Sequence, residues 1–264
     1  MFSLFSGIYR FRGFILGSVK REFALRYRNS MLGAAWLVFQ PLAQILVYTL
    51  IFARLMHSRL PGVDNTFGYS IFLCAGILTW GLFTEIVGRS LTMFIDNANM
   101  LKKLSFPRIV LPAIVVLSAS AGFSIIFGLF TVFLIISGNF PGISYLALVP
   151  VLLVHISFAL GLGMTIGVLN VFFRDVGQFF TIILQFWFWL TPIVYPLSTL
   201  PIWAQKIVML NPMTSIILSY QGIFVRSELP DWRSLGIVFA LGVLLCLLGL
   251  NLFRKHVGEM VDEL

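Results

Sequence analysis

Long uncharged apolar stretches alternate along the chain with short polar segments that hold most of its charged residues. A helix crosses roughly 30 Å of hydrocarbon with about 20 residues, because each residue advances the helix by about 1.5 Å. The section from Ile109 to Phe173 contains no Asp, Glu, Lys or Arg. Stretches of this kind predict six transmembrane helices, over Met31–Ala53, Phe67–Phe94, Ile109–Gly138, Ser144–Phe173, Val176–Pro192 and Leu235–Phe253.

Turn-forming residues and prolines mark where these helices end. The segment from Asn139 to Ile143, which contains Pro and Gly, predicts a tight hairpin between the third and fourth spans. Between Ile193 and Arg233 the chain is apolar but interrupted by prolines, so we expect two short helices that dip into the membrane. The alternative is a seventh crossing through Ile207–Val225, which would put the C-terminus on the opposite face.

The distribution of Lys and Arg distinguishes between these topologies, because the cytoplasmic loops of membrane proteins are enriched in basic residues. With six spans and a cytoplasmic N-terminus, 12 of the 18 basic residues fall in cytoplasmic segments and five fall outside. The remaining one, Arg89, lies in the second span. The charge pattern therefore favours six spans with both termini in the cytoplasm.

Before the first span, the segment from Tyr9 to Arg28 repeats apolar residues every four positions, with basic residues largely between them. This pattern predicts an amphipathic helix on the cytoplasmic leaflet. Positive charge that only sets the topology is the simpler alternative. We therefore divide the chain into a cytoplasmic interface segment, residues 1–30, and a transmembrane domain, residues 31–264.

The composition supports a protein that is dissolved in lipid: 59% of residues are hydrophobic, 11% are charged, and the mean hydropathy is +0.99. Cys74 and Cys246 both lie inside apolar stretches, where we expect them to be structural. The net charge of +8 comes from residues at predicted membrane boundaries, so anionic lipid is the expected partner rather than nucleic acid.

Few residues in the chain have the pattern of a catalytic or metal site. There is no Gly-rich phosphate loop followed by Lys and Ser or Thr, and the three histidines are isolated from one another. We therefore expect no cofactor, metal or enzymatic activity in this chain. Glu85 and Arg89 lie four apart on the second span, where they either line a polar path or form an ion pair near the inner boundary.

Four ordered motifs carry a resemblance to a known family. The first includes Arg26, Tyr27, Arg28, Ser30, Leu32, Gly33, Trp36 and Pro41. The others are Phe106-Pro107-Arg108 with Leu111-Pro112, Asn170–Asp175 with Trp187–Pro196, and Leu210-Asn211-Pro212. From end to end the chain resembles the permease subunits of polysaccharide-exporting ABC transporters of the O-antigen type, in the ABC-2 type permease family.

This resemblance implies a homodimer bound to two copies of a separate ABC ATPase, which binds the ATP and Mg²⁺. The implied cargo is a polyprenyl-diphosphate-linked polysaccharide such as O-antigen, exported across the bacterial inner membrane. An ABC permease for teichoic acid, capsule, a drug or a lipid is the first alternative. A membrane scaffold or an intramembrane enzyme is the second.

The resemblance also implies a segment that docks into the ATPase, at residues 96–108. The residues that we expect to contact the ATPase there are Asn97, Met100, Leu101, Lys102, Lys103 and Leu104. The turn at Arg174 and Asp175 is expected to form a second, smaller contact. The alternative is a solvated charged loop that serves only the topology.

A diphosphate headgroup needs cationic or N–H donors at the depth where the lipid enters. The candidates are Arg26, Arg28, Lys102, Lys103 and Arg108, which alternatively bind only bulk anionic lipid.

Sugar rings pack on aromatic side chains, so a glycan path is expected to include Phe180, Phe186, Trp187, Trp189 and Tyr195. The alternative for these residues is interfacial anchoring or packing. The outer segment 193–233 is expected to be the external gate or a static plug, with Pro196, Pro201, Trp203, Asn211 and Pro212 as its key residues.

Overall fold

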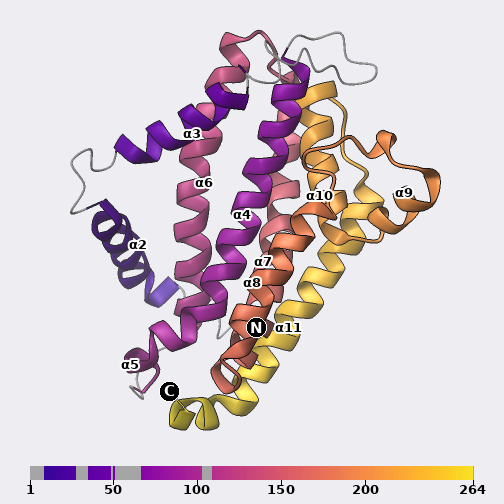
Figure 1. Cartoon of the computed structure of the whole chain (residues 1–264). Helices are drawn as coiled ribbons and strands as arrows, with labels where there is room; N and C mark the ends of the chain where they lie inside the picture. The colour runs from indigo at the N-terminus through magenta and orange to yellow at the C-terminus, as the bar shows by residue number, and fades with distance from the viewer. Residues whose placement is uncertain (1–8, 28–34, 49, 51–66, 103–108, 264) are drawn as a thin grey trace.

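The computed structural model describes residues 9–27, 35–48, 50, 67–102 and 109–263, and within these ranges the regular secondary structure is entirely helical (Figure 1). The prediction of an all-α protein is therefore confirmed. Its elements are α2 (Arg12–Tyr27), α3 (Trp36–Tyr48), α4 (Gly68–Asp96), α5 (Ala98–Leu101), α6 (Val110–Ile136), η3 (Gly142–Ala147), α7 (Leu148–Phe172), α8 (Asp175–Trp189), η4 (Leu197–Thr199), α9 (Ile202–Met209), α10 (Pro212–Gln221), η5 (Gly222–Arg226) and α11 (Trp232–Glu263).

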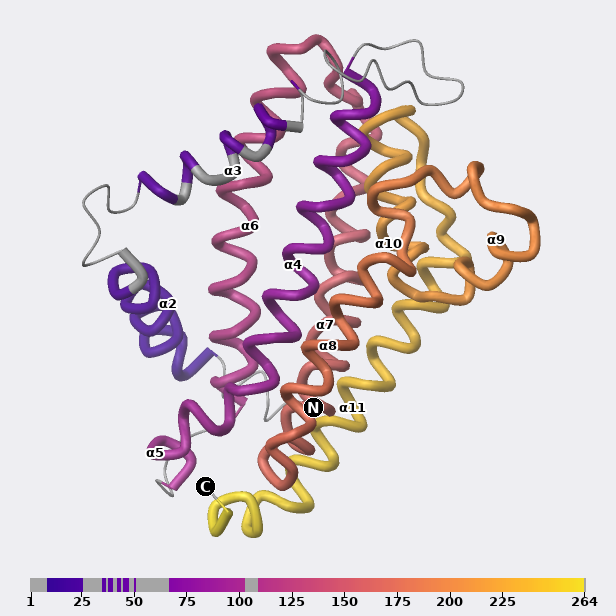
Figure 2. Tube along the Cα trace, viewed as in Figure 1, coloured from indigo at the N-terminus to yellow at the C-terminus, as the bar shows by residue number. Residues whose placement is uncertain are grey.

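Four helices are long and apolar enough to cross a membrane: α4, α6, α7 together with η3, and α11. They match the second, third, fourth and sixth predicted spans to within three residues at every end except the C-terminal end of α11, which lies ten residues beyond the predicted end at Phe253. The match follows from physical necessity, since in hydrocarbon a helix satisfies every backbone N–H and C=O within its own segment. α11 has 32 residues, and its last turns bend across the lower end of the bundle in Figure 2.

The count of six spans is not established by the described residues, which hold four spanning helices, or five if the bent pair α9 and α10 with η5 is counted as one. Of the first predicted span, the 13 residues of α3 are described as helix, while residues 31–34, 49 and 51–53 lie outside the described part. In the fifth, α8 has 15 residues, about 22 Å, and ends at Trp189 before the prolines at 192 and 196.

The outer segment forms two short helices rather than one straight crossing. The axes of α9 and of α10 with η5 differ by 101° at the break after Met209. Asn211 and Pro212 cause this break: Asn211 is the N-cap of α10, and its side chain accepts a hydrogen bond from the backbone N–H of Met213. The chain between Ile207 and Val225 is therefore not one straight helix, while the bent pair is either a broken span or a re-entrant segment, so the alternative of a seventh crossing stays open.

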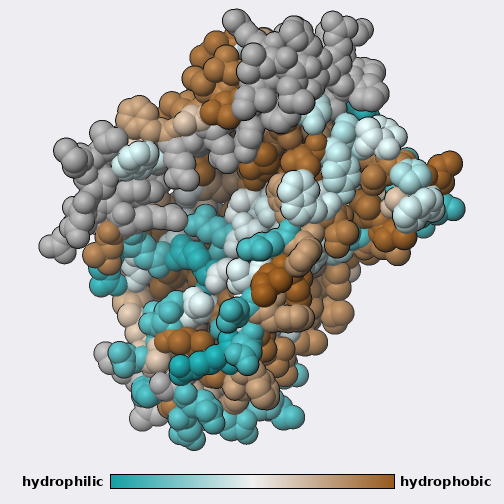
Figure 3. All heavy atoms as spheres, in the orientation of Figure 1, coloured by the Kyte–Doolittle hydropathy of each residue, from teal (hydrophilic) through white to brown (hydrophobic). Residues whose placement is uncertain are grey.

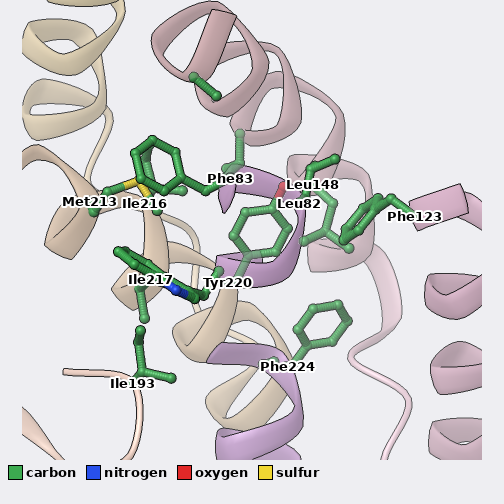
Figure 4. Packing of buried hydrophobic residues seen from close by; sticks show 14 of the residues in the cluster. Leu82, Phe83, Phe123, Leu148, Ile193, Met213, Ile216, Ile217, Tyr220 and Phe224 are labelled. Atoms are coloured by element: carbon green, nitrogen blue, oxygen red, sulfur yellow. The ribbon is translucent and has the colours of Figure 1, made fainter. Parts of the chain in front are cut away.

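The core of the bundle lies between α4, α7 and α10. Phe83 on α4 and Tyr220 on α10 are almost completely buried, and Figure 4 shows Tyr220 surrounded by Leu82, Ile217 and Phe224. Glycines bring the helices close, as is usual in membranes. A Cβ atom on Gly167 of α7 would lie 2.3 Å from the carbonyl oxygen of Ser90 on α4.

The two ends of the bundle differ in character. At the lower end of Figure 2 lie α5, the start of α8 and the last turns of α11, with α2 beside the lower half of α6. At the other end, the hairpin before α7 turns at Gly138 and Gly142, both with positive φ, which confirms the predicted tight turn. There the Oγ atom of Ser144 donates a 2.6 Å hydrogen bond to the carbonyl of Ser227.

Candidate functional site

A polar stripe runs along one face of α4. From Gly81 to Thr92, every position that is not buried is a glycine or a polar residue, namely Gly81, Thr84, Glu85, Gly88, Arg89 and Thr92. The exposed positions of α11 are very different, because they include Ile237, Phe239 and Leu244. Polar side chains at membrane depth require water or protein around them. The stripe is therefore not a lipid-facing surface.

The neighbouring helix α8 also exposes polar residues. Its uncovered positions include Gln178, Thr181 and Gln185, whose spacing puts them on one side of the helix. Figure 3 shows hydrophilic side chains gathered over the lower part of the face on which α4 lies. Sequence reasoning did not single out these α8 residues, although two glutamines within an apolar span were a signal for them.

At the inner end of the stripe, one carboxylate joins three helices. The Oε2 atom of Glu22 on α2 accepts a 2.5 Å hydrogen bond from Arg89 of α4 and a 2.6 Å hydrogen bond from Ser118 of α6. These residues line a cavity of about 500 Å³ together with Phe23, Leu25 and Glu85. The sequence had suggested Glu85 as the partner of Arg89. The structure adds Glu22, the only acidic residue between Tyr9 and Tyr27.

The predicted docking segment is partly described. Asn97 directly precedes the short helix α5, and its side-chain amide donates a hydrogen bond to the carbonyl of Met93. Leu101 is buried against the inner ends of the long helices, Met100 lines a second cavity, and Lys102 is exposed. Lys103, Leu104 and Arg108 lie outside the described residues.

The second predicted contact, at Arg174 and Asp175, lies on the exposed turn between α7 and α8. Asp175 is in the first turn of α8, where its negative charge interacts favourably with the positive end of the helix dipole. The side chain of Asn170 fixes this turn: it donates a 2.9 Å hydrogen bond to the carbonyl of Leu91 on α4, and it accepts a 2.7 Å hydrogen bond from the N–H of Gly177. Asn170 was quoted in the motif but given no role.

Of the five expected headgroup-binding residues, only Lys102 has a side chain within the described part of the chain. Arg26 belongs to α2, but its side chain lies outside the described part of the chain, as do Arg28, Lys103 and Arg108. Lys102 is exposed after α5, at the lower end of the bundle in Figure 1.

The five aromatic residues proposed for a glycan path do not share one surface. Phe186 and Trp189 are 67% and 64% exposed on α8. Phe180 and Trp187 pack instead against the core, where the ring of Trp187 makes edge contacts with Trp80 and Phe83. The hydroxyl of Tyr195 donates a hydrogen bond to the carbonyl of Trp189.

Of the five proposed gate residues, Asn211 and Pro212 form the bend at the start of α10. The indole of Trp187 donates to Asn211, which in turn donates to the hydroxyl of Thr191. Pro196 and Pro201 directly precede the short helices η4 and α9, and Trp203 is 68% exposed. Gln221 also holds this segment, because its amide nitrogen lies 3.2 Å from the carbonyl oxygen of Pro192.

Among the described residues, no group of three or more His, Cys, Asp or Glu is arranged to hold a metal ion.

Comparisons with known proteins point to a single family. Residues 15–225 match the family described as ABC-2 type transporter. The chain is 32% identical to the O-antigen export system permease protein RfbA of Myxococcus xanthus over 100% of both chains. It is 31% identical to a protein of the same name from Klebsiella pneumoniae, over 89% of this chain and 88% of that one. It is 21% identical to the polysialic acid transport protein KpsM of Escherichia coli, over 92% and 93% of the two chains.

Proposed function

Because this chain belongs to the ABC-2 type transporter family, we propose that it is the permease subunit of an ATP-driven exporter of lipid-linked O-antigen polysaccharide. Two relatives that match it at 31% and 32% identity are named as O-antigen export permeases. Its long apolar helices fit a protein that forms a path through a membrane. The proposed location is the bacterial inner membrane, with both termini in the cytoplasm.

The polar stripe of α4 is the observation that carries a transport function. A monomer in lipid would leave this face, with its two threonines and the partly exposed Glu85 and Arg89, beside hydrocarbon, which is unfavourable even for the ion-paired Arg89. Pairing with a second copy about a two-fold axis would enclose this face and leave a water-filled path between the subunits. We therefore propose a homodimer whose path is lined by α4 and by the exposed face of α8.

The aromatic part of this path is best represented by Phe186 and Trp189, whose side chains are free to meet a sugar ring. Phe180, Trp187 and Tyr195 are better suited to holding α8 and the outer segment in position. The outer segment 193–233 remains our proposal for the external gate. The backbone N–H and C=O groups left unpaired where its helices break are tolerated at membrane depth only when protein or water covers them.

We propose that two copies of an ABC ATPase, which bind ATP and Mg²⁺, dock at the inner end of the bundle. The contact would involve residues 96–108 and the turn at Arg174 and Asp175. Support comes from their common location, since α5 and the start of α8 lie at the same end in Figure 1. Basic residues near this end, including Lys102, are proposed to bind the lipid diphosphate.

Deletion of the gene tests this proposal. Lipid-linked glycan would be measured on each side of the inner membrane, with the intact chain returned as the control. Accumulation of long glycan on the cytoplasmic side supports export as the function. An unchanged distribution would contradict the O-antigen proposal.

A capsular polysaccharide is the second candidate cargo, because the chain also matches a polysialic acid transport protein at 21% identity. The same deletion separates the candidates, since the glycan that accumulates identifies the cargo.

A further inference from the structure

The contact between Glu22 and Arg89 connects a surface helix to the long helix that carries the polar stripe. The Oε2 atom of Glu22 receives both the 2.5 Å hydrogen bond from Arg89 and the 2.6 Å hydrogen bond from Ser118. One oxygen atom therefore ties α2 to α4 and to α6 at the same time.

Arg89 and Ser118 lie on the two helices that flank the proposed docking segment. Arg89 is about two turns before Asp96, where α4 ends, and Ser118 is about two turns after Val110, where α6 begins. The carboxylate of Glu22 thus bridges the two arms of the docking segment, by which we mean the last turns of α4 before it and the first turns of α6 after it. Any movement of one arm against the other changes the distances at this carboxylate.

The two connections of α2 are of different kinds. Toward α6, Ile15 packs against Val110 and Ile114 in a buried apolar cluster, which keeps α2 and α6 together. Toward α4, the contact is the ion pair between Glu22 and Arg89, whose side chains are 39% and 30% exposed. Water can replace the partners of such a half-exposed pair at small cost. The connection to α4 is therefore the one that opens first.

Two cavities meet at this ion pair. The first, of about 500 Å³, extends from Glu22 and Arg89 to Glu85 and Ser118. The second, of about 390 Å³, extends from the same two residues to Asp96, Asn97 and Met100 beside the docking segment. Glu22, Leu25 and Arg89 line both cavities, so the ion pair lies at the boundary that the two cavities share.

From this geometry we infer that Glu22 is a positioning residue, whose carboxylate holds α2 across both arms of the docking segment and closes the passage between the two cavities. When a displacement of α5 separates Arg89 from Glu22, the two cavities join, and the polar stripe of α4 becomes continuous with the docking end. The role of residues 96–108 as a docking segment and its displacement by an ATPase rest on the proposed function.

Thiol accessibility tests this inference directly. Val115 is 5% exposed and lines the second cavity, so Val115→Cys introduces a shielded thiol there. Cys74 and Cys246 would first be replaced by Ala, and the complex would be purified with its ATPase. We expect Glu22→Gln, which removes the negative charge of the ion pair, to raise the rate of labelling by a water-soluble maleimide by about threefold, in keeping with the small free energy of a half-exposed ion pair.

Two controls distinguish an opened contact from a loosened fold. Val151→Cys, at a fully buried core position, should stay unlabelled in the presence of Glu22→Gln. Lys20→Gln, which removes a charge from an exposed position of the same helix, should leave the labelling at Val115→Cys unchanged. Labelling that rises equally at both thiols, or at neither, would overturn the inference.

A charge exchange provides the second test. Glu22→Arg and Arg89→Glu should each lower export several-fold at an unchanged level of assembled complex, while the pair together should restore at least half of it. Single variants with normal export, or a pair no better than the singles, would overturn the positioning role. The labelling assay contains no glycan, so a wrong cargo would abolish only the export readout and leave the labelling result intact.

Discussion

The indole Nε1 atom of Trp187 donates a 2.9 Å hydrogen bond to the Oδ1 atom of Asn211, and thereby fastens the end of α8 to the start of α10. The same Oδ1 atom caps α10 through Met213, and the amide nitrogen of Asn211 donates to Thr191. The outer segment is therefore held by a polar network rather than by apolar packing alone.

Trp187→Phe removes one donor from this network and keeps an aromatic ring. We expect it to lower the free energy of unfolding by about 1 kcal/mol, because Asn211 loses a hydrogen bond in a partly buried place. Trp203→Phe makes the same chemical change at a 68% exposed position of the outer segment and should have little effect. Thermal unfolding in detergent measures both, and equal shifts would argue against the network.

Gly167 allows α7 to approach α4. Gly167→Ala would bring a Cβ atom to 2.3 Å from the carbonyl oxygen of Ser90, so we expect a loss of about 1–3 kcal/mol or failure to accumulate. Gly128→Ala on α6 meets no atom within 4 Å and should be neutral or slightly stabilising, since Ala is the better helix former. The yield in detergent and the thermal midpoint measure the difference between the two variants. Equal yields and equal midpoints would contradict the close approach of α7 to α4.

A large side chain on the polar stripe of α4 should block the proposed transport path without disturbing the fold. A Cβ atom on Gly88 has open space in the single chain, as does one on Gly236 of α11. We expect Gly88→Phe to lower glycan export at least tenfold while the protein level stays normal, and Gly236→Phe to leave export intact. Cell-surface glycan and immunoblotting measure the two quantities. Full export in Gly88→Phe would remove α4 from the proposed path.

Asn170 joins the turn before α8 to α4, so Asn170→Leu leaves the carbonyl of Leu91 and the N–H of Gly177 without these partners. We expect a loss of about 2 kcal/mol or more, because unsatisfied buried polar groups are unfavourable. Thr181→Leu makes a comparable polar-to-leucine change at an exposed position of α8 and should be less damaging. The order of the two thermal midpoints checks the prediction, and the reverse order would contradict it.

Asp231 precedes α11 and accepts hydrogen bonds from the hydroxyl of Ser234 and the N–H of Arg233, which hold its pKa below the ordinary value of 3.8. A depressed pKa in the folded state stabilises the protein above the unfolded pKa, and this contribution is lost as the pH falls through the folded value. Asp231→Ala should therefore lower the thermal midpoint at pH 7, and the difference from the native chain should narrow below pH 3.8. Glu228→Ala, at an exposed position, is the control.

Much of the fold follows from local sequence. Four predicted spans correspond to α4, α6, α7 and α11, because in lipid a long apolar run satisfies its backbone N–H and C=O groups within its own segment when it forms a helix. The tight turn before α7 and the bend at Pro212 also follow from nearby Gly and Pro residues. The family resemblance was likewise visible in motifs of adjacent residues, and the comparison with known families confirms it.

The site was predictable only in part. The aromatic residues of α8 were expected to share one role, yet Trp187 packs inward while Phe186 and Trp189 are exposed. Gln178, Thr181 and Gln185 mark one exposed side of α8, but Phe186 and Trp189 are exposed as well, and which aromatic residues are covered depends on the neighbours α4 and α7.

The sequence by itself determined the membrane character of the chain, the positions of its long helices and its family, since hydropathy, charge and motif order are properties of neighbouring residues. Tertiary structure alone decided that Glu22 meets Arg89 across 67 positions, that Trp187 meets Asn211, and that the uncovered side of α4 is polar. These relationships depend on how the helices pack against one another. Packing brings together side chains whose separation along the chain gives no sign of their contact.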